Sequence, residues 1–396
     1  MDKPQNKKSF VTKPLALLTS GHLITDLGQG ALPVLLPFLK MAFSLTYTQI
    51  GIIVLVQNLT SSVIQPLFGY LTDRISLPWL VPLSVLLAGI GLGITGIMNS
   101  YYTVLIAVVL GGLGIACFHP QASKLVHLVS NTATKGRSMG LFSVGGNLGL
   151  ALGSIAMSLA LNQPGVLDNT VYFILPAFVM ALLLYQNLQA ISPKPVLAHA
   201  AATSVAADKK PTLNYGLLAI ILGFVFVRSS IHTGLTTYIP LYYINYLSGD
   251  PMYASYLLAV FLLAGVVGTY VGAALSDRFG RKTVIMGSIS AALPLISLFP
   301  YTTGLATLIV LALTGLALIS SFATTVVLAQ EMMPGYVGMA SGLTIGFSIG
   351  LGGVGATILG YVADHFGVPS VFTVLAILPL AGVLLAWFLP GKLFKR

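Results

Sequence analysis

Long apolar segments separated by short polar turns run along the whole 396-residue chain. Each is long enough to cross about 30 Å of hydrocarbon as an α-helix. They lie at about residues 14–39, 48–71, 79–98, 102–124, 138–161, 170–190, 214–244, 252–275, 283–300, 304–329, 338–362 and 369–389. The pattern predicts an all-α membrane protein with about twelve transmembrane helices.

One longer polar segment, residues 191–213, interrupts this alternation near the middle of the chain. It contains Ala, Pro and Lys and has no apolar period, which is typical of a linker. We therefore expect an N-terminal six-helix bundle over residues 1–190, a cytoplasmic linker over residues 191–213, and a C-terminal six-helix bundle over residues 214–396.

The two predicted bundles repeat one another in sequence. An Asp-Arg pair follows the second helix at Asp73 and follows the eighth helix at Asp277, and at the same offset Phe118 corresponds to Phe322. Parallel repeats of this kind are typical of transporters whose halves are related by an axis along the membrane normal. The repeat predicts two pseudo-symmetric bundles.

Composition supports a lipid environment. Hydrophobic residues make up 56% of the chain and charged residues 7%, whereas soluble domains carry about 25% charged residues. The net charge of +10 does not indicate nucleic acid, because every cation except Lys40 and Arg228 falls on one predicted side of the membrane. The positive-inside rule then places both termini in the cytoplasm, as expected for a multi-pass protein of a bacterial inner membrane.

Several functional classes are excluded by what the sequence lacks. The single cysteine, Cys117, permits no internal disulfide, and neither a cofactor nor a metal site is expected. No phosphate-binding loop is present, so ATP does not drive the protein, and no catalytic motif indicates an enzyme.

Charged residues at the predicted cytoplasmic helix ends suggest a gate. The candidates are Asp73, Arg74, Asp277, Arg278, Arg281, Gln330 and Glu331. A carboxylate at one helix end can pair with a cation of the neighbouring bundle and hold the cytoplasmic face shut. The simpler alternative is that these cations only anchor the helix ends on the cytoplasmic side.

Titratable residues inside the first helix are candidates for proton coupling, because charged groups at membrane depth are costly and usually functional. His22 and Asp26 are four residues apart and share one helix face. His119, before Pro120 in the fourth helix, is a third candidate. We expect Asp26 to carry the proton with both histidines as helpers, and a static bridge between bundles is the alternative.

The seventh helix carries a second pair with the same spacing, Arg228 and His232. A guanidinium can bind an anion through two parallel hydrogen bonds. Arg228 and His232 are therefore predicted to contact an anionic substrate. Further substrate-binding candidates are Gln57, Asn58, Asn147 and Tyr238. The glycines of the fifth helix, Gly145 and Gly146 among them, are expected to serve helix packing.

These residues resemble the fosmidomycin-resistance family of the major facilitator superfamily. The resemblance rests on runs throughout the chain: Gly21 to Asp26, Phe43 to Gly51, Gln65-Pro66, Phe118-His119-Pro120, Val144 to Asn147, Gln330-Glu331 with Pro334-Gly335, and Gly352 to Ala356. The resemblance implies the two-bundle fold and export of a small anionic drug such as fosmidomycin in exchange for protons.

The expected function is thus proton-coupled antiport of a small anion by alternating access, carried out by a monomer. A proton symporter that imports a metabolite anion is the alternative, since the same residues serve either direction. A membrane sensor or scaffold with the same fold would tolerate neutral replacements of Asp26 and Arg228.

Overall fold

The structure is a computed structural model that describes residues 11–74, 77–130, 135–162, 167–192, 215–332 and 337–389. Helices account for nearly all of these residues, and no strand occurs among them. The predicted all-α class is confirmed. The predicted linker lies almost wholly outside the described ranges.

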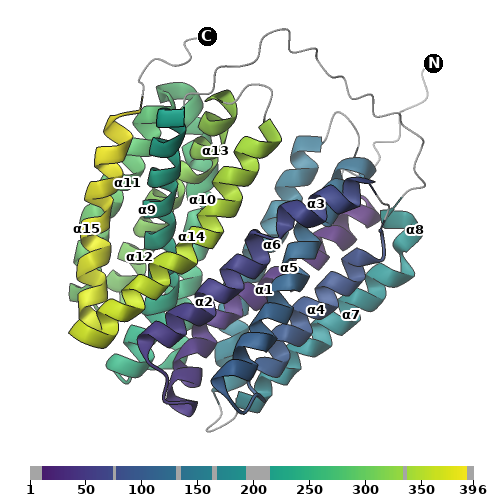
Figure 1. Ribbon diagram of the computed structural model, residues 1–396, viewed down its shortest axis with the longest axis horizontal. Helices are drawn as coiled ribbons and strands as arrows, with labels where there is room; N and C mark the ends of the chain where they lie inside the picture. Colours follow the sequence, from purple (N-terminus) through teal and green to yellow (C-terminus); the bar gives the residue numbers. More distant parts are fainter. Residues whose placement is uncertain are drawn as a thin grey trace.

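Figure 1 shows two groups of helices side by side, which we call the N-terminal half and the C-terminal half. The N-terminal half contains α1 (Lys13–Ala42), α2 (Tyr47–Ser62), α3 (Gln65–Arg74), α4 (Leu80–Thr95), α5 (Tyr101–Val129), α6 (Lys135–Leu161), η2 (Leu167–Phe173), α7 (Ile174–Gln186) and α8 (Leu188–Ile191).

The C-terminal half contains α9 (Tyr215–Pro240), η3 (Leu241–Tyr246), α10 (Pro251–Phe279), α11 (Arg281–Leu298), η4 (Phe299–Tyr301), α12 (Leu305–Ile319), α13 (Ser321–Met332), α14 (Val337–Phe366) and α15 (Val368–Trp387). The second predicted helix is divided into α2 and α3, because Pro66 supplies no backbone N–H and is accommodated at the start of a new helix. The tenth is divided at Ser320.

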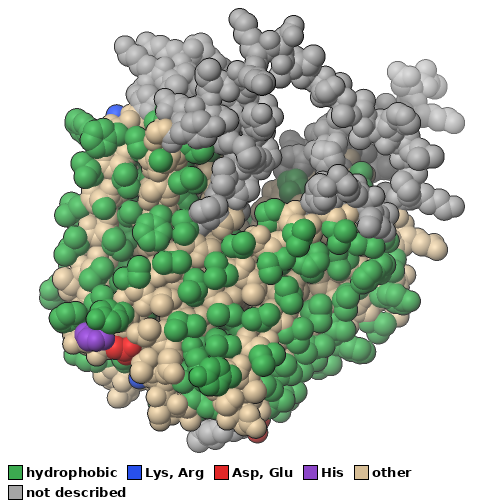
Figure 2. Space-filling model, in the orientation of Figure 1, with side chains coloured by type: hydrophobic (Ala, Val, Ile, Leu, Met, Phe, Trp, Pro, Cys, Tyr) green, Lys and Arg blue, Asp and Glu red, His purple; other side chains and the backbone are tan. Residues whose placement is uncertain are grey.

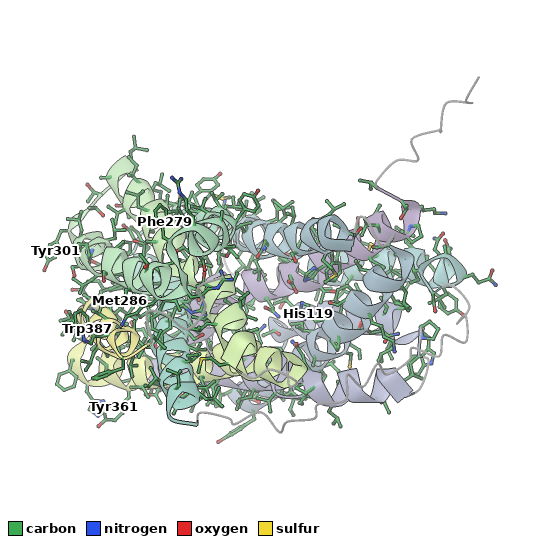
Figure 3. All side chains as sticks on the ribbon, turned by 90° about the horizontal axis from the view of Figure 1, so that it is seen from above. His119, Phe279, Met286, Tyr301, Tyr361 and Trp387 are labelled. Atoms are coloured by element: carbon green, nitrogen blue, oxygen red, sulfur yellow. The ribbon has the colours of Figure 1, made fainter. Side chains whose placement is uncertain are left out.

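Nine helical segments in the described residues are long and apolar enough to cross a membrane. The other three predicted spans correspond to α1 and α14, each of 30 residues, and to the shorter α4 of 16 residues. Apolar side chains cover the face seen in Figure 2, as expected where lipid replaces water. Tyr301, Tyr361 and Trp387 point outward at the periphery, whereas His119 points into the interior (Figure 3).

Helices begin with local caps at one end of the molecule. Thr46 accepts a hydrogen bond from Gln49 N, and the Gln49 side chain accepts one from Thr46 N, which forms a capping box at the start of α2. Ser100 and Thr103 form another at the start of α5. Such boxes satisfy two of the N–H groups that a helix start leaves without a partner. We call this end, which also carries Asp364, the Tyr47 end, and the opposite end, which carries Lys13 and Trp387, the Lys13 end.

The two halves meet closely at the Tyr47 end and diverge toward the Lys13 end. A Cβ on Gly360 of α14 would lie 2.4 Å from Tyr47 O, and one on Gly353 would lie 2.7 Å from Leu55 Cα. Nearer the Lys13 end, a Cβ on Gly350 or Gly346 would lie 3.5 Å or more from the atoms of α2 and of Val63, which follows α2. The close approach therefore needs glycine only toward the Tyr47 end, and Figure 1 shows α2 and α14 spreading apart from there.

Candidate functional site

A cavity of about 560 Å³ lies between the two halves. Its walls come from α1, α2 and α6 in the N-terminal half and from α9, α10 and α13 in the C-terminal half, with further residues from α12 and α14. Toward the Tyr47 end the space is closed by fully buried apolar side chains, including Leu35, Ile50 and Leu235. The cavity is thus a compartment shared by both halves.

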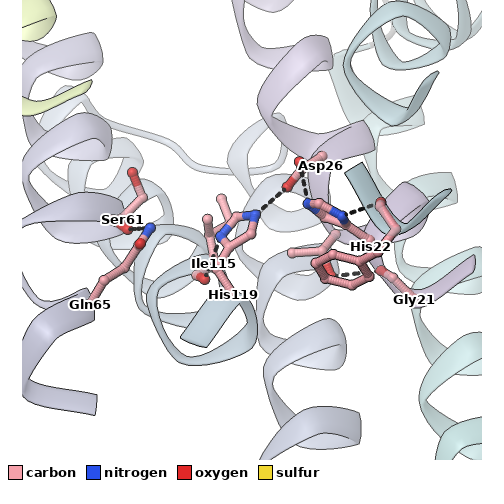
Figure 4. A network of polar contacts seen from close by, with 9 residues as sticks. Gly21, His22, Asp26, Ser61, Gln65, Ile115 and His119 are labelled. Carbon is pink, nitrogen blue, oxygen red and sulfur yellow. Dashed lines mark hydrogen bonds and ion pairs between the residues drawn. The ribbon is translucent and has the colours of Figure 1, made fainter. Parts of the chain in front are cut away.

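On the N-terminal wall, Asp26 lies between two histidines (Figure 4). His22 Nε2 is 3.1 Å from Asp26 Oδ2, and His119 Nε2 is 3.1 Å from Asp26 Oδ1. The second contact has the distance of an ion pair without the angle of a hydrogen bond, because Oδ1 has no hydrogen-bond partner in the described residues. Asp26 is only 6% exposed. The three predicted coupling residues therefore come together as one cluster, which we call the Asp26 triad.

The far nitrogens of the two histidines fix how protons can be arranged. His22 Nδ1 is 2.7 Å from Phe142 O, and His119 Nδ1 is 3.1 Å from Ile115 O. A carbonyl oxygen can only accept, so each Nδ1 carries a hydrogen and donates it. In a neutral imidazole Nε2 then bears a lone pair, which faces an oxygen of Asp26. Each proton that the triad takes up replaces such a lone-pair contact by an attractive one.

Helix α6 packs directly against His22 and Asp26 of the triad. His22 stacks on Phe142 with ring centroids 4.1 Å apart. A Cβ on Gly146 would lie 2.4 Å from His22 Nε2 and 2.7 Å from Asp26 Oδ2. Gly146 thus leaves the space that the His22–Asp26 contact occupies. This glycine was expected to serve helix packing, and its contact with the triad was not predicted.

On the opposite wall, Arg228 lies over the ring of Phe322, with 4.9 Å from Cζ to the ring centroid. His232 lies one helical turn further along α9, and the centroid of its ring is 5.5 Å from the centroid of the Phe261 ring. Arg228 is 5% exposed, and both residues line the cavity. A guanidinium fixed by an aromatic face keeps its N–H groups along its edge, where they can bind an anion.

The two walls show the internal repeat in three dimensions. Phe118 of α5 lies 5.9 Å from the His22 ring, and its counterpart Phe322 of α13 lies under Arg228. The residue after Phe118 is His119, whereas the residue after Phe322 is Ala323. One scaffold therefore supports the Asp26 triad in one half and a cation in the other.

Three more of the predicted substrate-binding residues, Gln57, Asn58 and Asn147, line the cavity. Tyr238 does not. It is fully buried beside α14, and its hydroxyl donates to Ala356 O at 3.0 Å. The helical register of α9 turns Tyr238 away from the face that carries Arg228, so it takes part in the closed packing at the Tyr47 end.

The predicted gate can be followed only in part. Arg281 Nη1 donates to Ser276 Oγ at 2.7 Å, and Arg278 lies 5.2 Å from the Phe279 ring centroid. The side chains of Asp73, Arg74, Asp277, Gln330 and Glu331 fall outside the described part of the structure. The gate at the Lys13 end remains a prediction.

Several cavity residues escaped the sequence analysis. They are uncharged polar side chains, most of them with hydroxyl groups: Gln29, Ser143, Ser229, Thr233, Thr236, Thr237 and Thr269. Hydroxyl residues recur in apolar helices without lining a cavity, because they can bond to their own backbone. The spacing from Ser229 to Thr233 follows one face of α9 and was the available signal.

The triad is also the group in the described residues whose ligand atoms could hold a metal, since these atoms lie within 4.8 Å of one another. Each Nε2 is at an ion-pair distance from an Asp26 oxygen.

A buried cavity between two helical halves, with titratable groups on one wall and a cation on the other, defines a membrane transporter. The chain matches the Major Facilitator Superfamily over residues 18–353, with a second match over residues 246–395. It is 33% identical over 386 residues to the fosmidomycin resistance protein of Escherichia coli (strain K12), a match that covers 96% of this chain and 93% of that protein.

A second sequence relative and two solved structures are also transporters. The uncharacterized MFS-type transporter YfnC of Bacillus subtilis (strain 168) is 33% identical, with 97% of this chain and 96% of the relative covered. A crystal structure of a D-xylose–proton symporter superposes with a TM-score of 0.74 at 16% identity, covering 98% of this chain and 100% of the other. A crystal structure of the nucleoside transporter NupG superposes with a TM-score of 0.70 at 16% sequence identity, and the match covers 97% of this chain and 100% of the other.

The chain therefore belongs to the Major Facilitator Superfamily and, within it, to the family of the fosmidomycin resistance protein. It is a multi-pass membrane transporter of small solutes and not an enzyme.

Proposed function

We propose that the protein is a proton-coupled antiporter that exports a small anionic solute such as fosmidomycin by alternating access. The observation that carries this proposal is the cavity itself, where His22 and Asp26 of the triad face Arg228 across one space. The name of the relative from Escherichia coli supports an outward direction for the drug, since resistance follows when a toxic compound leaves the cell.

In this mechanism the two bundles, residues 1–190 and 214–396, rock about the cavity. The anion binds the edge of Arg228, with His232, Gln57, Asn58 and Asn147 as further polar contacts. A proton entering from outside is taken up at an Nε2 or carboxylate oxygen of the Asp26 triad and leaves into the cytoplasm after the bundles have rocked. Both termini and the Lys13 end are then cytoplasmic, in a bacterial inner membrane, and the protein works as a monomer.

Symport of a proton with an imported metabolite anion is the second candidate, and the electrostatics of the cavity favour it. Protonation adds positive charge to the wall opposite Arg228, and two positive walls attract an anion more strongly than one. Proton and anion would then bind together rather than in turn.

The direction of proton movement separates the two. Purified protein in liposomes is given fosmidomycin and an imposed pH gradient, and drug flux and internal pH are recorded together. Opposite movement of drug and protons supports antiport, and movement in the same direction establishes symport. An absence of drug flux from protein that retains its fold would remove fosmidomycin as the substrate.

A further inference from the structure

The start of α2 is held by a side chain from the opposite half. Asp364, in the last turns of α14, accepts a hydrogen bond from Tyr47 N at 2.6 Å through Oδ1. Its Oδ2 accepts from Thr48 N at 2.8 Å and from Thr48 Oγ1 at 2.6 Å. One carboxylate therefore joins the two halves through three donors.

The local structure of α2 explains why these donors need a partner. Its capping box already satisfies the N–H groups of Thr46 and Gln49. The N–H groups between them, on Tyr47 and Thr48, have no acceptor within their own helix, as at any helix start. Asp364 takes these two, and its negative charge lies at the positive end of the α2 dipole.

The surrounding backbone is shaped for this contact. Gly360, one turn before Asp364 on the same face of α14, lets the helix approach until a Cβ there would lie 2.4 Å from Tyr47 O. Within the described part of the chain, two other hydrogen bonds join the halves at the Tyr47 end. Asn245 Nδ2 donates to Pro37 O at 3.3 Å, and Ser154 Oγ donates to Ser255 O at 3.4 Å. Among these inter-half contacts, only the one at Asp364 has a charged acceptor.

We propose that Asp364 is the positioning residue that holds the Tyr47 end closed and that must leave the start of α2 whenever the cavity opens there. The contact joins parts of the chain that alternating access has to separate. Asp364 is exposed, so water can replace the three donors when the ends part. The contact is thus strong enough to favour the closed end and accessible enough to be broken in each cycle.

The test measures opening without substrate and without a pH gradient, so its outcome is independent of the proposed direction of transport. Spin labels are placed on Met41→Cys and Phe366→Cys, exposed positions of opposite halves at the Tyr47 end, with Cys117 replaced by serine. Pulsed electron paramagnetic resonance gives the distance distribution in detergent and in lipid.

Asp364→Asn keeps the size of the side chain but removes its charge and turns one acceptor into a donor. We expect the ratio of long to short distances to rise about fivefold, the usual effect of losing a side-chain cap at a helix start. Thr48→Val removes only the hydroxyl donor and should give a smaller shift in the same direction.

The matched control is Asp168→Asn. Asp168 is exposed near the same end, but its helix η2 packs on α4, α6 and α7 within the N-terminal half. An unchanged distribution in Asp364→Asn, or an equal shift in Asp168→Asn, overturns the proposal. If Asp364→Asn does not fold, Thr48→Val decides the question by the same criterion, since a shift supports the proposal and no shift overturns it.

Discussion

Asp26 Oδ1 on α1 and His119 Nε2 on α5 lie 3.1 Å apart, and His22 approaches the other oxygen of the same carboxylate at the same distance. The carboxylate is therefore surrounded by two bases from two helices. Both helices belong to the N-terminal half, so a proton held here is carried by one rigid half and does not depend on the contact between halves.

Replacing Asp26 by asparagine should separate coupling from binding. Asparagine has the same shape, but it cannot take up a proton and can donate to only one neighbouring Nε2 at a time. We expect flux driven by a pH gradient to be lost, since carboxylates at this depth form the proton relays of transporters. Exchange of labelled for unlabelled substrate, which moves no net proton, should continue.

Asp168→Asn provides the matched control, because the same substitution at an exposed position should alter neither assay. Full pH-driven flux in Asp26→Asn at normal protein levels would show that the coupling proton is bound elsewhere.

The contribution of His119 can be isolated with a second histidine that has the same local geometry. His119 and His365 each place Nδ1 on the carbonyl four residues earlier, at 3.1 and 2.9 Å. Of these two histidines, His119 presents Nε2 to Asp26 and His365 does not. His119→Gln should therefore reduce the number of protons moved per substrate, measured from substrate flux and internal pH together, while His365→Gln should not. Equal effects of the two changes would assign His119 a structural role.

Gly146 offers a steric test of the triad that changes no charge. A methyl group there would lie 2.4 Å from His22 Nε2, so the His22–Asp26 contact has to break or α6 has to move. Gly146→Ala should lose pH-driven flux much as Asp26→Asn does.

The control is Gly140, on the same helix. A methyl group added there would have no other atom of the described residues within 4 Å. Gly140→Ala should keep full activity, with helix stability raised by up to about 1 kcal/mol. Normal coupling in Gly146→Ala would mean that the close His22–Asp26 contact is not needed.

Much of this site could be predicted from sequence, and the reasons for the rest are physical. Charged groups are so costly in an apolar helix that His22, Asp26 and Arg228 stand out by themselves. The contact of His119 with Asp26 required the packing of α5 on α1, and helical periodicity does not show which helices touch. Tyr238 was predicted to bind substrate from its place among polar residues of the seventh helix, but in the structure its hydroxyl donates to Ala356 O.

The role of Asp364 depends on a pairing that no local pattern reveals. Thr46 and Gln49 have the sequence of a capping box, yet nothing near them in the chain indicates that the intervening N–H groups bind a carboxylate from α14. Such contacts between distant parts of the chain became visible only in the folded structure.

The anion site can be tested through the ring beneath Arg228. Phe322→Leu keeps an apolar side chain of similar bulk but removes the aromatic face that lies 4.9 Å from Cζ. A buried cation–π contact contributes about 0.5–2 kcal/mol, and its loss allows the guanidinium to turn away from the substrate. We expect KM for the anion to rise by roughly two- to thirtyfold, by the same free-energy range, with the proton count unchanged. The control is Phe279→Leu, which removes the ring beside Arg278 at 5.2 Å, outside the cavity. An unchanged KM in Phe322→Leu, or an equal rise in both variants, would show that the ring beneath Arg228 does not position the guanidinium for the anion.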